Sequence, residues 1–111
     1  MLNIDTLREY GANVDTGLAR CMGKEDFYLM LIGKASADTR IELLERQLSQ
    51  KDLDGAFETA HALKGLLANL SLDPLTAPVV EMTELLRSRT DTDYSELLQE
   101  IKAQFEKLRC L

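Results

Sequence analysis

The stretch KDLDGAFETAHALKGLLANLS, residues 51–71, decides the fold. Its apolar residues recur at three- and four-residue steps, which is the period of an amphipathic α-helix. Because a helix advances about 100° per residue, these residues share one face. They are Leu53, Ala56, Phe57, Ala60, Leu63, Leu67 and Leu70. The stretch therefore predicts a helix that opens at Asp52 or Asp54, closes near Ser71 and buries this face in a core.

The residues before this stretch have the same helical period. Short helices are predicted over residues 3–10 and 14–21, because glycines follow both segments. Residues 24–50 could form one long helix, but Gly33 and Ser36 weaken its middle and could kink it or divide it in two. No sustained strand-like alternation bounded by hairpin turns interrupts the pattern.

Two more helices are predicted after the central stretch. Pro74 and Pro78 lie in the first turns of a segment running to about Arg89, where proline is tolerated because its missing N–H would be unpaired anyway. The last helix is predicted to begin at Asp93 and to bury one apolar stripe. That stripe consists of Leu97, Leu98, Ile101, Phe105 and Leu108.

Four long amphipathic helices joined by short turns favour an all-α fold, an antiparallel four-helix bundle. The 111-residue chain suits a single domain, 1–111, because it is too short for two ordinary cores. Within it, residues 1–22 are predicted to form short capping helices and residues 24–109 the bundle. A monomer is expected, since four such helices can bury one another's stripes.

Composition and charge argue against several classes of function. The formal net charge of −6 argues against unspecific binding to nucleic acid or to an anionic membrane surface. No segment approaches the roughly 20 apolar residues of a membrane span, and no signal peptide is evident. Cys21 and Cys110 are far apart, with no CxxC and no neighbouring ligands, so they predict free thiols rather than a metal site. These features together lead us to expect a cytoplasmic protein.

The only histidine of the chain, His61, lies in the central stretch. On the helical wheel it flanks the core face, and Lys64, Gly65 and Ala68 lie on the same flank one and two turns further along. That surface is almost free of side chains except for one ammonium group. Gly65 costs the helix about 1 kcal/mol relative to alanine and has no obvious packing gain there.

Each of these residues has an ordinary explanation when taken alone. A single surface histidine is most often a boundary residue, a lysine can extend its stem along an apolar face, and a glycine can mark close packing. Glu58, one turn before His61, either holds the imidazole or faces water, and water is the favoured alternative. Together, a nucleophile, a nearby cation and an uncluttered approach are the parts needed to place a phosphoryl group on a side chain.

The segment HALKGLLANLS resembles the signature of histidine-containing phosphotransfer (HPt) domains. In that family a helix carries a histidine, a leucine, a lysine and a glycine at the spacing of His61, Leu63, Lys64 and Gly65. The resemblance extends over nearly the whole chain. NVDTGLARCMGKEDFYLMLI resembles the family's leader and first bundle helix, KDLDGAFETA its approach to the histidine, and VVEMTELLRS its following helix.

Two positions depart from the family's pattern. Leu66 occupies a place where members usually carry a small or polar residue, and Ser71 stands where many have glycine. The first is expected to alter the rim around the site and the second the way in which the helix ends. Neither departure removes the reacting group.

The resemblance implies a phosphorelay intermediate of a two-component signalling system. His61 would accept a phosphoryl group from a receiver-domain aspartate and pass it to another, with no nucleotide bound and no kinase activity of its own. Lys64 would stabilise the phosphoryl oxygens, and Gly65 would give the partner access. The implied partners are receiver domains of response regulators or hybrid histidine kinases. No cofactor of its own is expected, since the receiver would bring the Mg²⁺ ion.

Other interpretations stay open. The chain could be a helical-bundle adaptor in which His61 is incidental, or the excised phosphotransfer domain of a larger histidine kinase. Its methionine start favours a standalone protein over the excised domain. An enzyme acting alone has little support, because the sequence has no Gly-rich phosphate loop and no second histidine.

Overall fold

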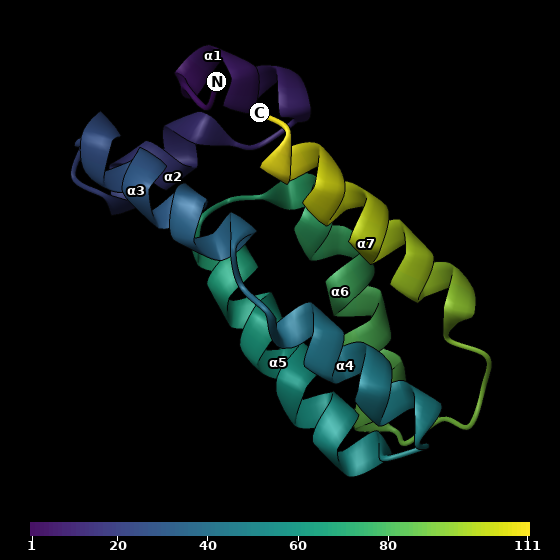
Figure 1. Ribbon diagram of the computed structural model, residues 1–111. Coiled ribbons are helices and arrows are strands. Elements are labelled where there is room, and N and C mark those ends of the chain that lie inside the picture. Colours follow the sequence, from purple (N-terminus) through teal and green to yellow (C-terminus); the bar gives the residue numbers. More distant parts are fainter.

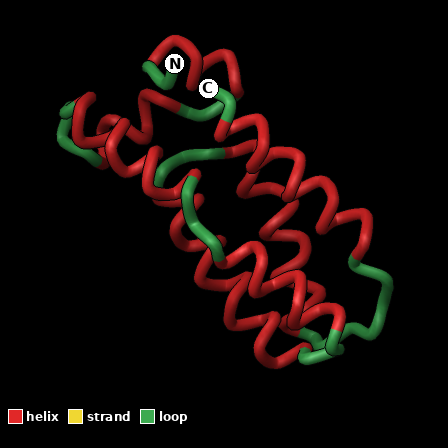
Figure 2. Tube along the Cα trace, viewed as in Figure 1, coloured by secondary structure: helices red, strands yellow, loops and turns green.

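The computed structural model describes all residues, 1–111, and contains seven α-helices and no strand (Figures 1 and 2). The predicted all-α class is therefore confirmed. The helices are α1 (Ile4–Tyr10), α2 (Val14–Arg20), α3 (Glu25–Ser36), α4 (Arg40–Ser49), α5 (Leu53–Asn69), α6 (Asp73–Arg87) and α7 (Ser95–Arg109). None of them is both long and apolar enough to cross a membrane.

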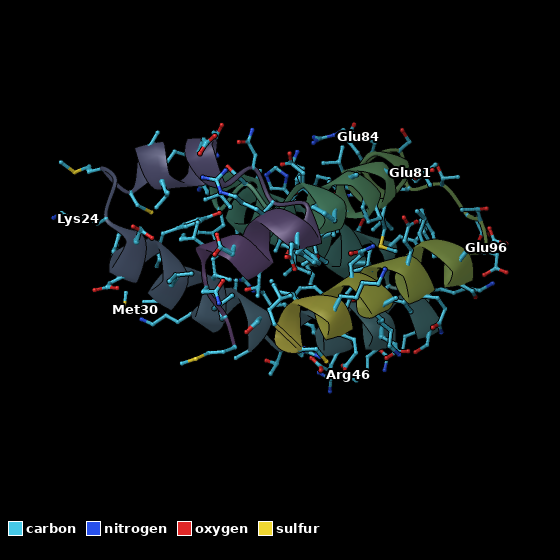
Figure 3. All side chains as sticks on the ribbon, turned by 90° about the horizontal axis from the view of Figure 1, so that it is seen from above. Lys24, Met30, Arg46, Glu81, Glu84 and Glu96 are labelled. Carbon is cyan, nitrogen blue, oxygen red and sulfur yellow. The ribbon has the colours of Figure 1, made fainter.

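The four helices α4 to α7 lie along the long axis of the molecule and alternate in direction (Figure 1). Helix α5 packs against both α4 and α6, and α7 packs against α6. An ion pair between Lys102 Nζ and Glu45 Oε2, 3.1 Å long, links α7 to α4. Helices α1 to α3 lie at one end of this bundle, where both chain termini also lie. Figure 3 shows Lys24 and Met30 at that end and Glu96 near the opposite one.

A single apolar core of 24 buried residues connects the bundle with the N-terminal helices. The predicted face of α5 faces this core, although Leu53 and Phe57 at its edge are only partly buried. Thr59 is also buried, which the apolar pattern does not predict. Its hydroxyl donates a 2.7 Å hydrogen bond to Gln47 Oε1 on α4, so the buried polar group has a partner.

The predicted helix over residues 24–50 is divided in two. Gly33 stays helical, and α3 ends at Ser36, whose hydroxyl donates to the Gly33 carbonyl at 2.8 Å. The Asp38 carboxylate then accepts the backbone N–H of Arg40 at 2.8 Å and starts α4. The Arg40 guanidinium also bonds this carboxylate and holds the pKa of Asp38 below its ordinary value. Of the two predicted alternatives, a kink or a break, the chain adopts the break.

The other helix ends lie at or near their predicted residues. Of the two predicted caps of α5, Asp52 is the one used, and its carboxylate accepts the Gly55 N–H at 3.0 Å. Helix α7 begins at Ser95, two residues later than predicted, because Asp93 lies outside the helix and accepts the Ser95 N–H at 2.9 Å. Pro78 lies inside α6, beyond the first turn in which its missing N–H has no cost.

Four non-glycine residues adopt left-handed backbone conformations, each just after a helix end. Their φ angles are +58° at Met22, +57° at Lys51, +57° at Ser71 and +52° at Arg89. This conformation costs a non-glycine residue about 1–2 kcal/mol. It lets the next N–H turn back to the helix, as in the 3.1 Å bond from the Leu72 N–H to the Leu67 carbonyl. A glycine at residue 71 would fit the same turn without strain.

The C-terminal end of α5 is fixed by the N-terminal helices. Tyr28 of α3 is fully buried, and its hydroxyl donates a 2.7 Å hydrogen bond to the Leu70 carbonyl. Burial raises the pKa of this tyrosine to about 12. Arg20 of α2 donates to the Ala68 carbonyl at 2.6 Å. The helix that carries His61 is therefore held at both ends and along one face.

Candidate functional site

The imidazole of His61 is exposed near the middle of α5. Lys64 and Gly65 follow at helical spacing, so they lie one turn away on the same side of the helix. Ala68, two turns away, is exposed as well. The three predicted site residues thus share one surface strip of α5, because their spacing in a regular helix places them there. The core face lies on the other side, where Leu63 and Leu67 are fully buried.

Gly65 has no neighbour that requires a glycine. A Cβ atom built at this position meets nothing within 4 Å, and the backbone is helical rather than left-handed. Alanine would therefore fit and would favour the helix by about 1 kcal/mol. Packing inside the domain does not account for the glycine. Its effect is to leave the backbone beside His61 uncovered.

Lys64 is half-buried and forms neither a hydrogen bond nor an ion pair, so its ammonium group has no anionic partner within the domain. The nearby guanidinium groups do have partners. Arg87 pairs with Glu84 at 3.3 Å, and Arg89 pairs with Asp54. Lys64 can therefore receive an anion without giving up an existing partner.

Glu58, one turn before His61, is exposed and forms no hydrogen bond with the imidazole. This agrees with the favoured expectation that it faces water. Glu81 and Glu84 on the neighbouring α6 project outward from the bundle (Figure 3). The imidazole forms no hydrogen bond or ion pair with any carboxylate of the chain.

A phenylalanine instead contacts the imidazole, which the sequence analysis missed. The rings of Phe57 and His61 are stacked, with their centroids 5.7 Å apart and an angle of 23° between their planes. The guanidinium carbons of Arg87 and Arg89 lie 5.1 and 4.9 Å from the centroid of the Phe57 ring. The four-residue spacing of Phe57 and His61 was the available signal, since such pairs meet on a helix surface.

The unusual Leu66 does not lie on the His61 strip. It is half-buried and lines a shallow hollow beside α3, together with Leu31 and Ala35. On the wheel it points well away from His61. The leucine therefore faces this hollow and leaves the imidazole open.

No three histidine, cysteine or carboxylate side chains are close enough together to hold a metal ion. Cys21 is buried and Cys110 is exposed, and both are free thiols, as predicted.

The sequence model of the Hpt domain family matches residues 30–109 of the chain. The match covers most of the chain and includes all four bundle helices. The chain therefore belongs to the Hpt domain family, whose members take part in histidine phosphotransfer in phosphorelays and interact with receiver domains. No curated protein and no solved structure gives a significant match.

Proposed function

We propose that this protein is a phosphorelay intermediate in which His61 accepts a phosphoryl group from the aspartate of one receiver domain and donates it to the aspartate of another. One observation carries the proposal. Within an Hpt domain, the only imidazole of the chain is exposed on α5, beside an unpaired ammonium group and an uncovered stretch of backbone.

The chemistry needs only groups that the two proteins would bring. A neutral imidazole nitrogen attacks the phosphorus of an aspartyl phosphate, the bond between phosphorus and the carboxylate oxygen breaks, and the carboxylate leaves. The phosphorus is then bonded to nitrogen, and the second ring nitrogen can release its proton to water. Attack by another receiver's carboxylate reverses these steps and restores the imidazole. The Lys64 ammonium lies where it can approach the phosphoryl oxygens and offset their charge.

The partner would supply the remaining parts of the site. A receiver would bring the acidic pocket and the Mg²⁺ ion, so the chain would need no cofactor of its own. The net charge of −6 fits a protein partner better than nucleic acid or a membrane surface. We propose that the protein acts as a monomer in the cytoplasm, with receiver domains of response regulators or hybrid histidine kinases as donor and acceptor.

Incubation with a phosphorylated receiver domain tests the proposed function. We expect the purified protein to acquire phosphate that is labile in acid and stable in base, as a phosphoramidate is. Addition of an unphosphorylated second receiver should then remove the label. A protein that binds receivers tightly but never becomes labelled would instead be an adaptor.

We predict that Lys64→Ala slows transfer without abolishing it. The ammonium stabilises the phosphoryl oxygens by about 1–3 kcal/mol, which corresponds to a few-fold to roughly hundred-fold lower rate. Single-turnover kinetics with a phosphorylated receiver measure this rate. Lys107→Ala, which removes an exposed lysine on α7, is the matched control and should transfer as the wild type does. Equal transfer rates in Lys64→Ala and the wild type would show that Lys64 does not contribute to phosphoryl transfer.

We predict three separate effects of Gly65→Gln. Glutamine has a higher helix propensity than glycine, and its side chain would enter open space without a clash. The free energy of unfolding should therefore rise by up to about 1 kcal/mol. The bulk of the glutamine should weaken receiver binding and thus transfer, because the partner's loops must approach the backbone beside His61. Labelling by a small donor such as phosphoramidate should not change, since a small molecule needs no such approach.

Gly65→Ala separates helix propensity from bulk, since it adds one methyl group at the same place. It should be stabilised as much as Gly65→Gln or slightly more, and it should transfer faster than the glutamine variant. Destabilisation of both variants would mean that Gly65 serves internal packing. Normal receiver transfer by Gly65→Gln would show that the partner does not come close to this residue.

A further inference from the structure

The ring stack beside His61 includes residues from two helices and a turn. Phe57 lies one turn before the histidine on α5 and is half-buried against the core. Arg87 is the last residue of α6, and Arg89 lies in the turn that follows. Both guanidinium groups lie about 5 Å from the Phe57 ring, a distance at which cations interact favourably with an aromatic ring. The aromatic side chain that contacts His61 is therefore itself held in place.

Arg89 is fixed more firmly than an ordinary surface arginine. Its side chain is hydrogen-bonded to Asp54 on α5 and, at 2.8 Å, to the Leu86 carbonyl. Its backbone has a φ of +52°, a conformation that favours glycine. The turn is closed by a 3.0 Å bond from the Thr90 N–H to the Leu85 carbonyl, the usual geometry of a helix that ends in glycine. An arginine there brings a cation to Phe57 that glycine could not provide.

We propose that Phe57, held by Arg87 and Arg89, is a positioning residue that sets the orientation of the His61 ring for phosphoryl transfer. The proposal rests on the proposed function and adds a residue to it. The attacking lone pair lies in the plane of the imidazole, so rotation of the ring about its bond to Cβ moves the lone pair away from the phosphorus. An exposed histidine rotates broadly about that bond. Stacking on Phe57 narrows this rotation before the receiver arrives, which favours reaction.

Replacement of Phe57 by leucine and by tyrosine tests whether Phe57 positions the His61 ring. Leucine keeps apolar bulk and removes the aromatic ring, whereas tyrosine keeps the ring. At saturating phosphorylated receiver, we expect Phe57→Leu to lower the maximal transfer rate about three- to ten-fold, with the half-saturating receiver concentration unchanged. Phe57→Tyr should restore the rate. Labelling by phosphoramidate should stay within about two-fold of wild type, because a small donor can meet the ring in any orientation.

The stack can also be observed without any partner. Proton NMR shifts of the two carbon-bound imidazole protons report the nearby aromatic ring, and they should move toward values of a free histidine in Phe57→Leu but not in Phe57→Tyr. A structural role of Phe57 alone would change the melting temperature without this pattern of shifts and rates.

Arg89→Gly provides a second test, with Lys51→Gly as its matched control. Both changes put glycine at a left-handed turn after a helix, so both relieve the same backbone strain. Only Arg89→Gly removes a cation from Phe57. We expect both variants to remain folded, with imidazole shifts and a maximal transfer rate that change only in Arg89→Gly and in the same direction as in Phe57→Leu.

The outcomes separate this proposal from the function on which it rests. A wild-type protein that never takes up phosphate from a receiver would overturn the proposed function. A wild-type protein that transfers normally, with equal maximal rates in Phe57→Leu and wild type, would overturn the positioning role alone. Wild-type imidazole shifts equal to those of Phe57→Leu would show that the rings are not stacked in solution.

Discussion

The variant His61→Gln is expected to take up no phosphate, either from a phosphorylated receiver or from phosphoramidate. His61 is the only imidazole of the chain, and glutamine has no nitrogen lone pair that can attack phosphorus. The melting temperature should stay within a few degrees of wild type, because the side chain is exposed and contributes little packing. Labelling with radioactive phosphate and a thermal melt measure both effects.

Receiver binding by His61→Gln provides the control for this result. The variant should still bind receivers, since the uncovered surface around residue 61 remains, so a lost label would reflect lost chemistry rather than lost docking. Retained labelling in His61→Gln would refute the phosphorelay proposal. Unfolding of the variant would contradict the exposed position of the histidine on α5.

The second large effect is expected for Gly17→Ala, on stability. A Cβ atom at Gly17 would lie 2.5 Å from the ring of Tyr28. The tyrosine cannot move aside easily, because its ring is fully buried and its hydroxyl donates to the Leu70 carbonyl. We expect the free energy of unfolding to fall by about 2–4 kcal/mol, even after the better helix propensity of alanine is included. Chemical denaturation measures this change.

Gly33→Ala is the matched control for this prediction. Gly33 also lies inside a helix, but a Cβ atom there meets nothing within 4 Å. Alanine at residue 33 should therefore stabilise the protein by up to about 1 kcal/mol. A similar effect of both substitutions would show that Tyr28 does not pack tightly against α2.

The all-α class, the order of the helices and the buried face of α5 could be predicted, because all three depend on local spacing. The exposed positions of His61 and Gly65 follow from the same wheel. The break between α3 and α4 is harder to predict, since Gly33 and Ser36 allow either a kink or a break. The choice depends on Asp38, whose carboxylate bonds the first residue of α4. Such a local competition has no periodic signature.

The contacts of His61 were less predictable than its position. The apolar pattern assigned Phe57 to the core, but the side chain lies at the edge and also reaches the imidazole. Arg87 and Arg89 approach it only because α6 runs back along α5 and ends beside Phe57. The sequence does not reveal this approach, since the residues are about thirty positions apart and neither belongs to an apolar stripe.

The unpaired state of Lys64 bears on the energetics of a relay. In many binding sites a cation must leave a carboxylate before it can take a new anion, and that exchange adds reorganisation energy to the reaction barrier. Lys64 has no such partner, so under the proposed function this contribution to the barrier would be absent. In the proposed carrier the ammonium would gain an anion only while His61 holds the phosphoryl group, so it would stabilise the phosphorylated state relative to the unphosphorylated one.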